Sequence, residues 1–125
     1  MQVHTEDHGR VRIVSIVVSA IDASNAGELY ARVTEETKGW RRVIVDLSQA
    51  GAIDGDGLAA LCECWRSARN RGIQLTLCGL PARCRLAARL LRLGELMALF
   101  EDRIEAMHAH GLSLPVAELP QLALS

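Results

Sequence analysis

Residues 42–47, Arg-Val-Ile-Val-Asp-Leu, constrain the fold more than any other segment of this chain. The run is short, apolar at its centre and bounded by turn residues, which is typical of a buried central strand. Residues 11–18 are rich in β-branched side chains and residues 73–78 alternate in polarity, so both predict further strands. Weaker strand signals lie at residues 2–6 and 96–100. A β-sheet is therefore expected at the centre of the fold.

Helical patterns separate these strands. Apolar spacing and turn residues predict helices over residues 25–37, 57–70, 82–93 and 102–109. Residues 48–56 are expected to form a loop before the second helix. Strands that alternate with helices predict an α/β fold. We expect a single domain with a central mixed β-sheet of four to five strands and about four helices.

Composition excludes several classes of protein. The chain has 125 residues, half of them hydrophobic, and a formal net charge of −1, which suits about one domain. Its longest nearly apolar run, residues 13–21, is about half of a membrane span, and its polar start lacks a signal-peptide core. The near-neutral charge and four aromatic side chains give no nucleic-acid footprint. We expect no direct membrane insertion and no nucleic-acid partner.

The cysteines indicate a reducing compartment, because they sit inside apolar segments rather than at the spacings of a disulfide framework. We expect buried free thiols at Cys62, Cys64, Cys78 and Cys84. Cys62 and Cys64 are two apart on a predicted helix, so they cannot bind one metal ion together. No histidine lies near a candidate nucleophile in the sequence. These patterns favour a cytoplasmic protein that is not an enzyme and uses no metal or cofactor.

Residues 46–58 carry the clearest motif of the chain. They read Asp-Leu-Ser-Gln-Ala-Gly-Ala-Ile-Asp-Gly-Asp-Gly-Leu. Ala-Ile-Asp-Ala at residues 20–23, Gly-Leu-Pro at 79–81 and Leu-Gly-Glu-Leu at 93–96 lie in a matching order. Together these segments resemble the STAS domain, the fold of bacterial anti-sigma factor antagonists, over about residues 10–107. The resemblance implies a single-domain STAS-like fold.

The resemblance also implies a protein-binding module and not an enzyme. In this family, the serine just after the loop aspartate is phosphorylated by a partner kinase that doubles as the anti-sigma factor, and the phosphate breaks the complex. Here Asp54 matches the aspartate, but Gly55 stands at the serine position. Glycine has no oxygen to phosphorylate. The usual switch is therefore not expected to operate at this position.

Asp56 stands where the family often has a second hydroxyl residue. It is either a fixed negative signal for a partner or a helix cap or first-turn carboxylate that stabilises the helix by about 0.5–1 kcal/mol. The resemblance places partner docking on this loop and the helix after it. The expected partner-binding residues are Asp22, Asp54, Gly55, Asp56, Gly57, Leu58, Arg66 and Arg69.

The resemblance leaves three roles open. The first is binding to an anti-sigma factor that is also a serine-kinase-like ATPase. The second is a STAS subunit of an ABC-type lipid transport system, docked on an ABC ATPase subunit. The third is a self-associating, stressosome-like scaffold, and a homodimer is possible. We expect the domain at residues 1–110 and an apolar extension or tail at residues 111–125, which holds five leucines and no lysine or arginine.

Overall fold

The structure is a computed structural model that describes residues 1–90 and 98–111. Its strands are β1 (Gln2–His8), β2 (Val11–Ile21), β3 (Arg42–Asp46), β4 (Ala50–Ile53), β5 (Gln74–Cys78) and β6 (Ala98–Phe100). Its helices are α1 (Ala26–Thr37), α2 (Gly55–Asn70), α3 (Ala82–Leu90) and α5 (Arg103–Ala109). The alternation of strands and helices confirms the predicted α/β fold.

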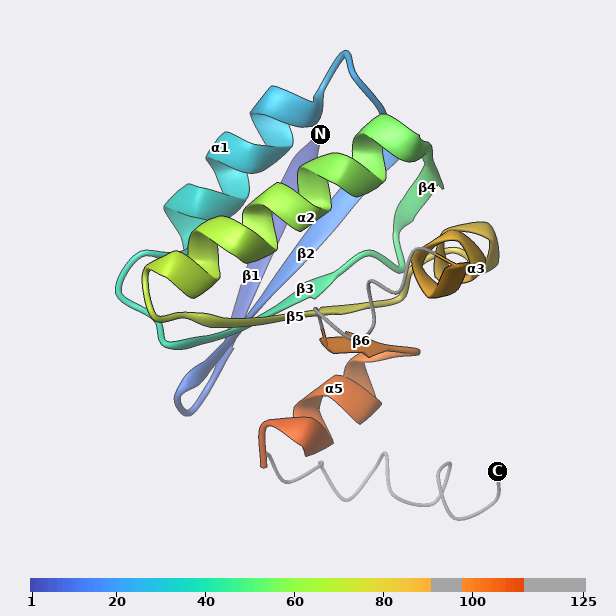
Figure 1. Cartoon of the computed structure of the whole chain (residues 1–125). Helices are drawn as coiled ribbons and strands as arrows, with labels where there is room; N and C mark the ends of the chain where they lie inside the picture. The colour runs from blue at the N-terminus through green and yellow to red at the C-terminus, as the bar shows by residue number, and fades with distance from the viewer. Residues whose placement is uncertain (91–97, 112–125) are drawn as a thin grey trace, which may run out of the picture.

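The sheet is mixed, with the order β1-β2-β3-β5-β6 (Figure 1). β1 pairs antiparallel with β2, and the remaining pairs are parallel. On the side away from β1, the long strand β2 has two neighbours. Its first half pairs with β3 and its second half with β4. All the parallel strands therefore present their carboxyl ends at one edge of the sheet, which we call the carboxyl edge. The opposite edge, where they begin, is the amino edge.

Helices cover both faces of the sheet. Successive side chains of a strand point to opposite faces, so Val14 and Val45 pack into the core beneath α1 and α2. Ile13 and Ile44 point the other way and pack with Met107 of α5. Figure 1 shows α1 and α2 side by side on one face and α5 beyond the other. The continuous apolar character of residues 43–45 follows from this double covering.

Some local predictions need correction. The loop predicted over residues 48–56 is wrong in part, because residues 50–53 form β4 and α2 already begins at Gly55. The strand predicted over residues 11–18 continues to Ile21. Residues 91–93 of the predicted third helix, residues 96–97 of the predicted strand and residues 112–125 of the predicted extension lie outside the described residues.

All four cysteines are free, as predicted, and Cys64, Cys78 and Cys84 are buried. Cys62 is only half-buried, so it does not belong to the fully buried stripe of α2. Burial raises the pKa of the Cys64 thiol to about 12, which keeps it protonated near neutral pH. Among the helices of residues 1–90 and 98–111, none is long and apolar enough to cross a membrane.

Candidate functional site

The candidate site lies at the carboxyl edge, where α2 begins. Asp54 is the N-cap of α2, and its Oδ1 atom accepts a hydrogen bond from the Gly57 N–H at 2.9 Å. The Asp54 carbonyl accepts the Leu58 N–H at 2.9 Å, which is the first bond of the helix. Asp54 thus satisfies donors that a helix N-terminus otherwise leaves free. Asp56 is therefore not the N-cap, because Asp54 fills that position, but it is a carboxylate in the first turn of α2, as the alternative expected.

A close backbone contact fixes this helix start against the end of β2. A Cβ atom added at Gly57 would lie 2.4 Å from the Ile21 carbonyl oxygen, so only glycine fits there without movement. The Asp54 N–H donates to the same carbonyl at 3.3 Å. These contacts hold the segment of residues 54–58 beside the turn that follows β2. They join Asp22 and Asp54, which lie far apart in the sequence.

Asp22 is held by its own turn. Its Oδ1 atom accepts hydrogen bonds from the Ser24 hydroxyl and, at 2.9 Å, from the Ser24 N–H. These bonds, the hydroxyl first, lower the pKa of the Asp22 carboxyl, so it is charged at neutral pH. Asn25 closes the turn by accepting from the Asp22 N–H at 3.0 Å and donating to the Ala20 carbonyl at 2.7 Å. Asn25 therefore supports the turn and does not cap α1 with its side chain.

The segment of residues 54–58 has an exposed half and a buried half. Asp54, Gly55 and Asp56 are exposed, whereas Gly57 and Leu58 are buried. A Cβ atom at Gly55 would meet nothing within 4 Å. Among the described residues, Asp22, Asp54 and Asp56 take part in no ion pair. The surface available to another molecule is therefore acidic, and Gly57 and Leu58 position it from beneath.

Arg66 and Arg69 do not join this cluster. Arg66 lies twelve residues beyond Asp54, which corresponds to roughly 18 Å along the helix. Its guanidinium forms an ion pair with Glu63 at 2.7 Å. The Arg69 guanidinium lies over the Trp65 ring, 5.3 Å from its centroid. Both arginines occupy the outer surface of α2, but at its far end.

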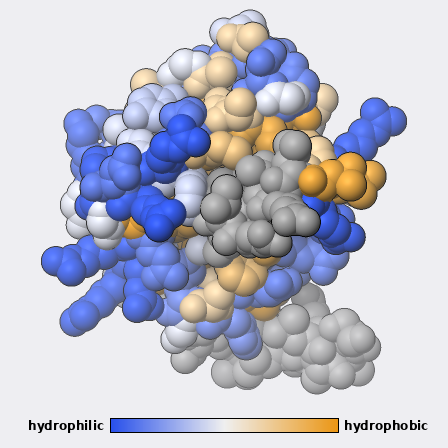
Figure 2. Space-filling view, viewed as in Figure 1, coloured by the Kyte–Doolittle hydropathy of each residue, from blue (hydrophilic) through white to orange (hydrophobic). Residues whose placement is uncertain are grey.

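Sequence reasoning missed the position of α3 beside this site. The Cys84 thiol donates to the Ile53 carbonyl at 3.2 Å, which holds the start of α3 against the end of β4. Leu86 and Leu90 of α3 are 56% and 76% exposed. In Figure 2, orange apolar side chains appear toward the side of the molecule where Figure 1 places α3. The sequence signal that could have indicated this exposed apolar surface is a pair of leucines, Leu86 and Leu90, four residues apart among arginines.

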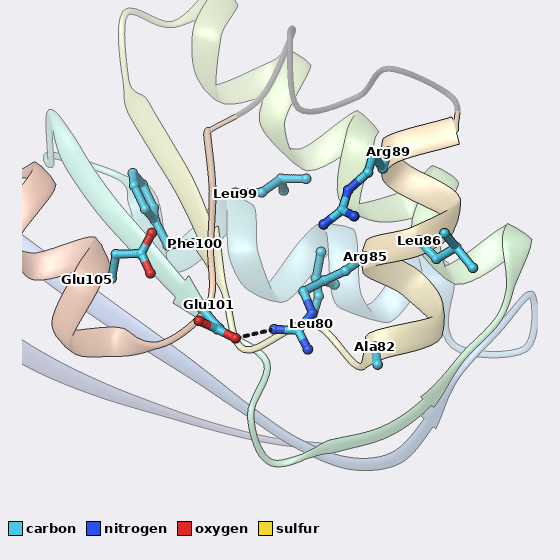
Figure 3. A pocket seen from close by; sticks show the side chains of 9 residues that line it. All are labelled: Leu80, Ala82, Arg85, Leu86, Arg89, Leu99, Phe100, Glu101 and Glu105. Carbon is cyan, nitrogen blue, oxygen red and sulfur yellow. Dashed lines mark hydrogen bonds and ion pairs between the residues drawn. The ribbon is translucent and has the colours of Figure 1, made fainter. Parts of the chain in front are cut away.

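A cavity of about 550 Å³ lies between α3 and β6 (Figure 3). Leu80 and Leu99 form part of its wall, and the guanidinium of Arg85 pairs with the Glu101 carboxylate at 3.3 Å. The exposed Leu86 of α3 is also among the residues that line this cavity (Figure 3). Among residues 1–90 and 98–111, none of the side chains that line the cavity is a serine, cysteine or histidine.

A mixed sheet covered on both faces, with a capped helix start at its carboxyl edge, defines a small α/β domain. The STAS domain family model matches residues 2–106. The chain therefore belongs to the STAS domain family, as the sequence motifs predicted. This family is generally non-enzymatic. No curated protein matches the chain by sequence.

Solved structures share the fold at low sequence identity. A putative anti-sigma factor antagonist from Thermotoga maritima has a TM-score of 0.74 and 19% identity, over 86% of this chain and 92% of that one. An anti-sigma factor antagonist from Mycobacterium paratuberculosis has a TM-score of 0.74 and 20% identity, over the same shares. The murine anion transporter Slc26a9 has a TM-score of 0.68 and 19% identity, over 82% of this chain but only 18% of its own. The same fold thus occurs alone and as one part of a large transporter.

Proposed function

We propose that this chain is a non-enzymatic, protein-binding regulatory module that binds an anti-sigma factor of the serine-kinase-like ATPase type. The observation that carries the proposal is the start of α2, where Asp54, Gly55 and Asp56 are exposed at the carboxyl edge of a STAS fold. Asp22 lies in the neighbouring turn and adds a third carboxylate. Such an edge suits a partner with a basic surface, because complementary charge guides and orients docking.

The proposal includes the loss of the phosphorylation switch. A phosphate at this edge would add about −1.5 to −2 charge. Gly55 offers no hydroxyl for it, and the open space at its Cα accommodates a serine. The module would then bind its partner without control by phosphorylation at this position. The Asp56 carboxylate would contribute a constant negative charge beside it.

The binding experiment uses a purified anti-sigma factor of the serine-kinase-like ATPase type. Isothermal titration calorimetry with wild type and Asp56→Lys should show about tenfold weaker binding for the variant. Glu35→Lys makes the same change of charge in the last turn of α1, away from the carboxyl edge, and should bind as wild type does. Equal binding by all three proteins would contradict the proposed surface.

Phosphorylation is tested with the same ATPase and ATP, followed by mass spectrometry of the peptide that contains residues 54–58. The wild type should carry no phosphate there, and Gly55→Ser should acquire it if the kinase recognises the restored hydroxyl. Phosphate on the wild-type segment would contradict the loss of the switch.

The ABC-transport alternative uses the same calorimetric assay with an ABC ATPase subunit in place of the kinase-like ATPase. Binding of the ABC ATPase alone would favour the transport role. Self-association without either partner, measured by analytical ultracentrifugation, would favour the scaffold role. The proposal includes a cytoplasmic location, because the partners named here are expected in the cytoplasm. It also includes a possible homodimer.

A further inference from the structure

The amino edge of the sheet has a cavity that the proposed function does not use. It has a volume of about 440 Å³ and is lined by Arg10, Val11, Arg41, Arg42 and His110. Arg10 comes from the turn after β1, Arg41 and Arg42 from the start of β3, and His110 from the end of α5. The pairing of Val11 with Arg42 brings the first two segments together. Four basic side chains thus converge on one hollow, and the described part of its lining has no carboxylate.

The arginines around this cavity differ from the neighbouring Arg12 in their ion pairing. Arg12 pairs with Asp7 at 2.8 Å and with Glu36 at 3.2 Å. Within residues 1–90 and 98–111, Arg10 and Arg41 form no ion pair and no side-chain hydrogen bond. Arg42 makes one donation, to the His110 carbonyl at 3.1 Å. Most of the guanidinium N–H groups around the hollow thus have no acceptor among the described residues.

His110 forms a buried wall of the cavity. The residue is 5% exposed, and its Nε2 atom lies 3.1 Å from the Thr76 hydroxyl oxygen. Its Nδ1 atom is buried and has no hydrogen-bond partner among the described residues, an uncommon state for a polar atom in a folded protein. Both the arginines and the imidazole therefore have hydrogen-bonding capacity that the described part of the chain does not satisfy.

We propose that this cavity is a binding site for a small molecule that carries a phosphate or pyrophosphate group. Guanidinium groups match the oxygens of a phosphate with paired N–H donors, and such charge-assisted bonds are the strong ones. The volume lies in the range of small-molecule pockets. The site is at the opposite edge from Asp54, so it does not depend on the proposed partner surface.

The test measures inorganic pyrophosphate binding by isothermal titration calorimetry at low ionic strength, where charge interactions are least screened. The double variant Arg10→Gln/Arg41→Gln should bind about tenfold or more weakly than wild type. Arg32→Gln/Arg83→Gln removes the same charge from exposed positions on α1 and α3 and should bind within about twofold of wild type. Both double variants replace exposed side chains, and equal melting temperatures would confirm that they fold.

Two outcomes would overturn the site: no saturable binding of pyrophosphate, or an equal loss in both double variants, which would indicate net charge alone. The source of the phosphate group is resolved with vesicles of phosphatidylcholine that contain phosphatidic acid. Competition between these vesicles and pyrophosphate would identify a lipid headgroup as ligand. Saturable pyrophosphate binding without competition would identify a free phosphorylated molecule.

Discussion

The two edges of the sheet carry side chains of opposite charge. At the carboxyl edge, Asp22 and Asp54 accept backbone N–H groups, and Gly57 allows a helix start to touch the end of a strand. At the amino edge, Arg10 and Arg41 surround a hollow without an ion-pair partner among the described residues. At the carboxyl edge, the start of α2 is packed closely against the end of β2, and the Gly57 N–H has its acceptor. The amino edge has a cavity, and most of the guanidinium N–H groups around it have no acceptor within residues 1–90 and 98–111.

Helix direction explains this difference. In parallel β–α units, helices begin at the carboxyl edge and run back toward the amino edge. Helix N-termini favour negative charge and C-termini favour positive charge. Asp54 caps the start of α2 and Asp102 the start of α5, while Arg42 donates to the His110 carbonyl at the end of α5. The net charge of −1 conceals this separation.

The largest effect is expected where the carboxyl edge is tightest. Gly57→Ala places a Cβ atom against the Ile21 carbonyl oxygen and should lower the free energy of unfolding by about 2–3 kcal/mol. Gly55→Ala is the matched control, because its Cβ atom meets nothing within 4 Å, and it should raise stability by up to about 0.5 kcal/mol. Urea denaturation measures both. Equal losses in the two variants would mean that packing at Gly57 is not the constraint.

The next effect concerns the buried Asp46 at the same edge. Its carboxylate accepts from the Ser48 N–H at 2.9 Å and pairs with Arg103 at 3.2 Å. Arg103→Met leaves this carboxylate without its cation and should cost about 2 kcal/mol. Arg85→Met removes the exposed pair with Glu101 and should cost below about 0.5 kcal/mol. Similar denaturation midpoints for the two variants would show that Arg103 is replaceable.

A smaller effect separates the two aspartates at the start of α2. Asp54→Ala removes the acceptor of the Gly57 N–H and should cost about 1 kcal/mol. Asp56→Ala removes only a first-turn charge and should cost about 0.3–0.5 kcal/mol. Thermal denaturation at low salt compares them. A larger loss for Asp56→Ala would reverse the assignment of the cap.

Much of this architecture is predictable from sequence, because burial imposes a period on the side chains. Residues 43–45 are apolar throughout since both faces of β3 are covered, and the order of the predicted elements holds along the described chain. The strand β4 is not predictable from a side-chain period, because Ala-Gly-Ala-Ile is short and lies in a segment rich in turn residues. Its strand character comes from pairing with β2, and a Cβ atom at Gly51 would clash with the Ser19 carbonyl at 2.1 Å.

The acidic segment at the carboxyl edge and the cavity at the amino edge also differ in how far the sequence predicts them. The acidic segment at residues 54–58 is contiguous and carries a family motif, so sequence reasoning finds it. Which aspartate caps the helix depends on backbone geometry, which the sequence does not display. The residues of the amino edge are separated by up to 100 positions, from Arg10 to His110, and only the strand register and α5 bring them together. No local spacing could indicate that cavity.

The last prediction concerns His110 and the dependence of stability on pH. Burial, and to a lesser extent the nearby Arg42, lower the pKa of this imidazole in the folded state. Below the ordinary histidine pKa of about 6.5, the unfolded chain therefore takes up the proton first, and stability is lost as the pH falls through the folded pKa. His110→Gln should flatten the fall in melting temperature between about pH 7 and about pH 5. His108→Gln, which replaces an exposed imidazole on the same helix, should retain the wild-type slope. An unchanged slope in His110→Gln would contradict this prediction. It would mean that the folded protein tolerates a charged imidazole at the amino edge, and that the arginines there repel it only weakly.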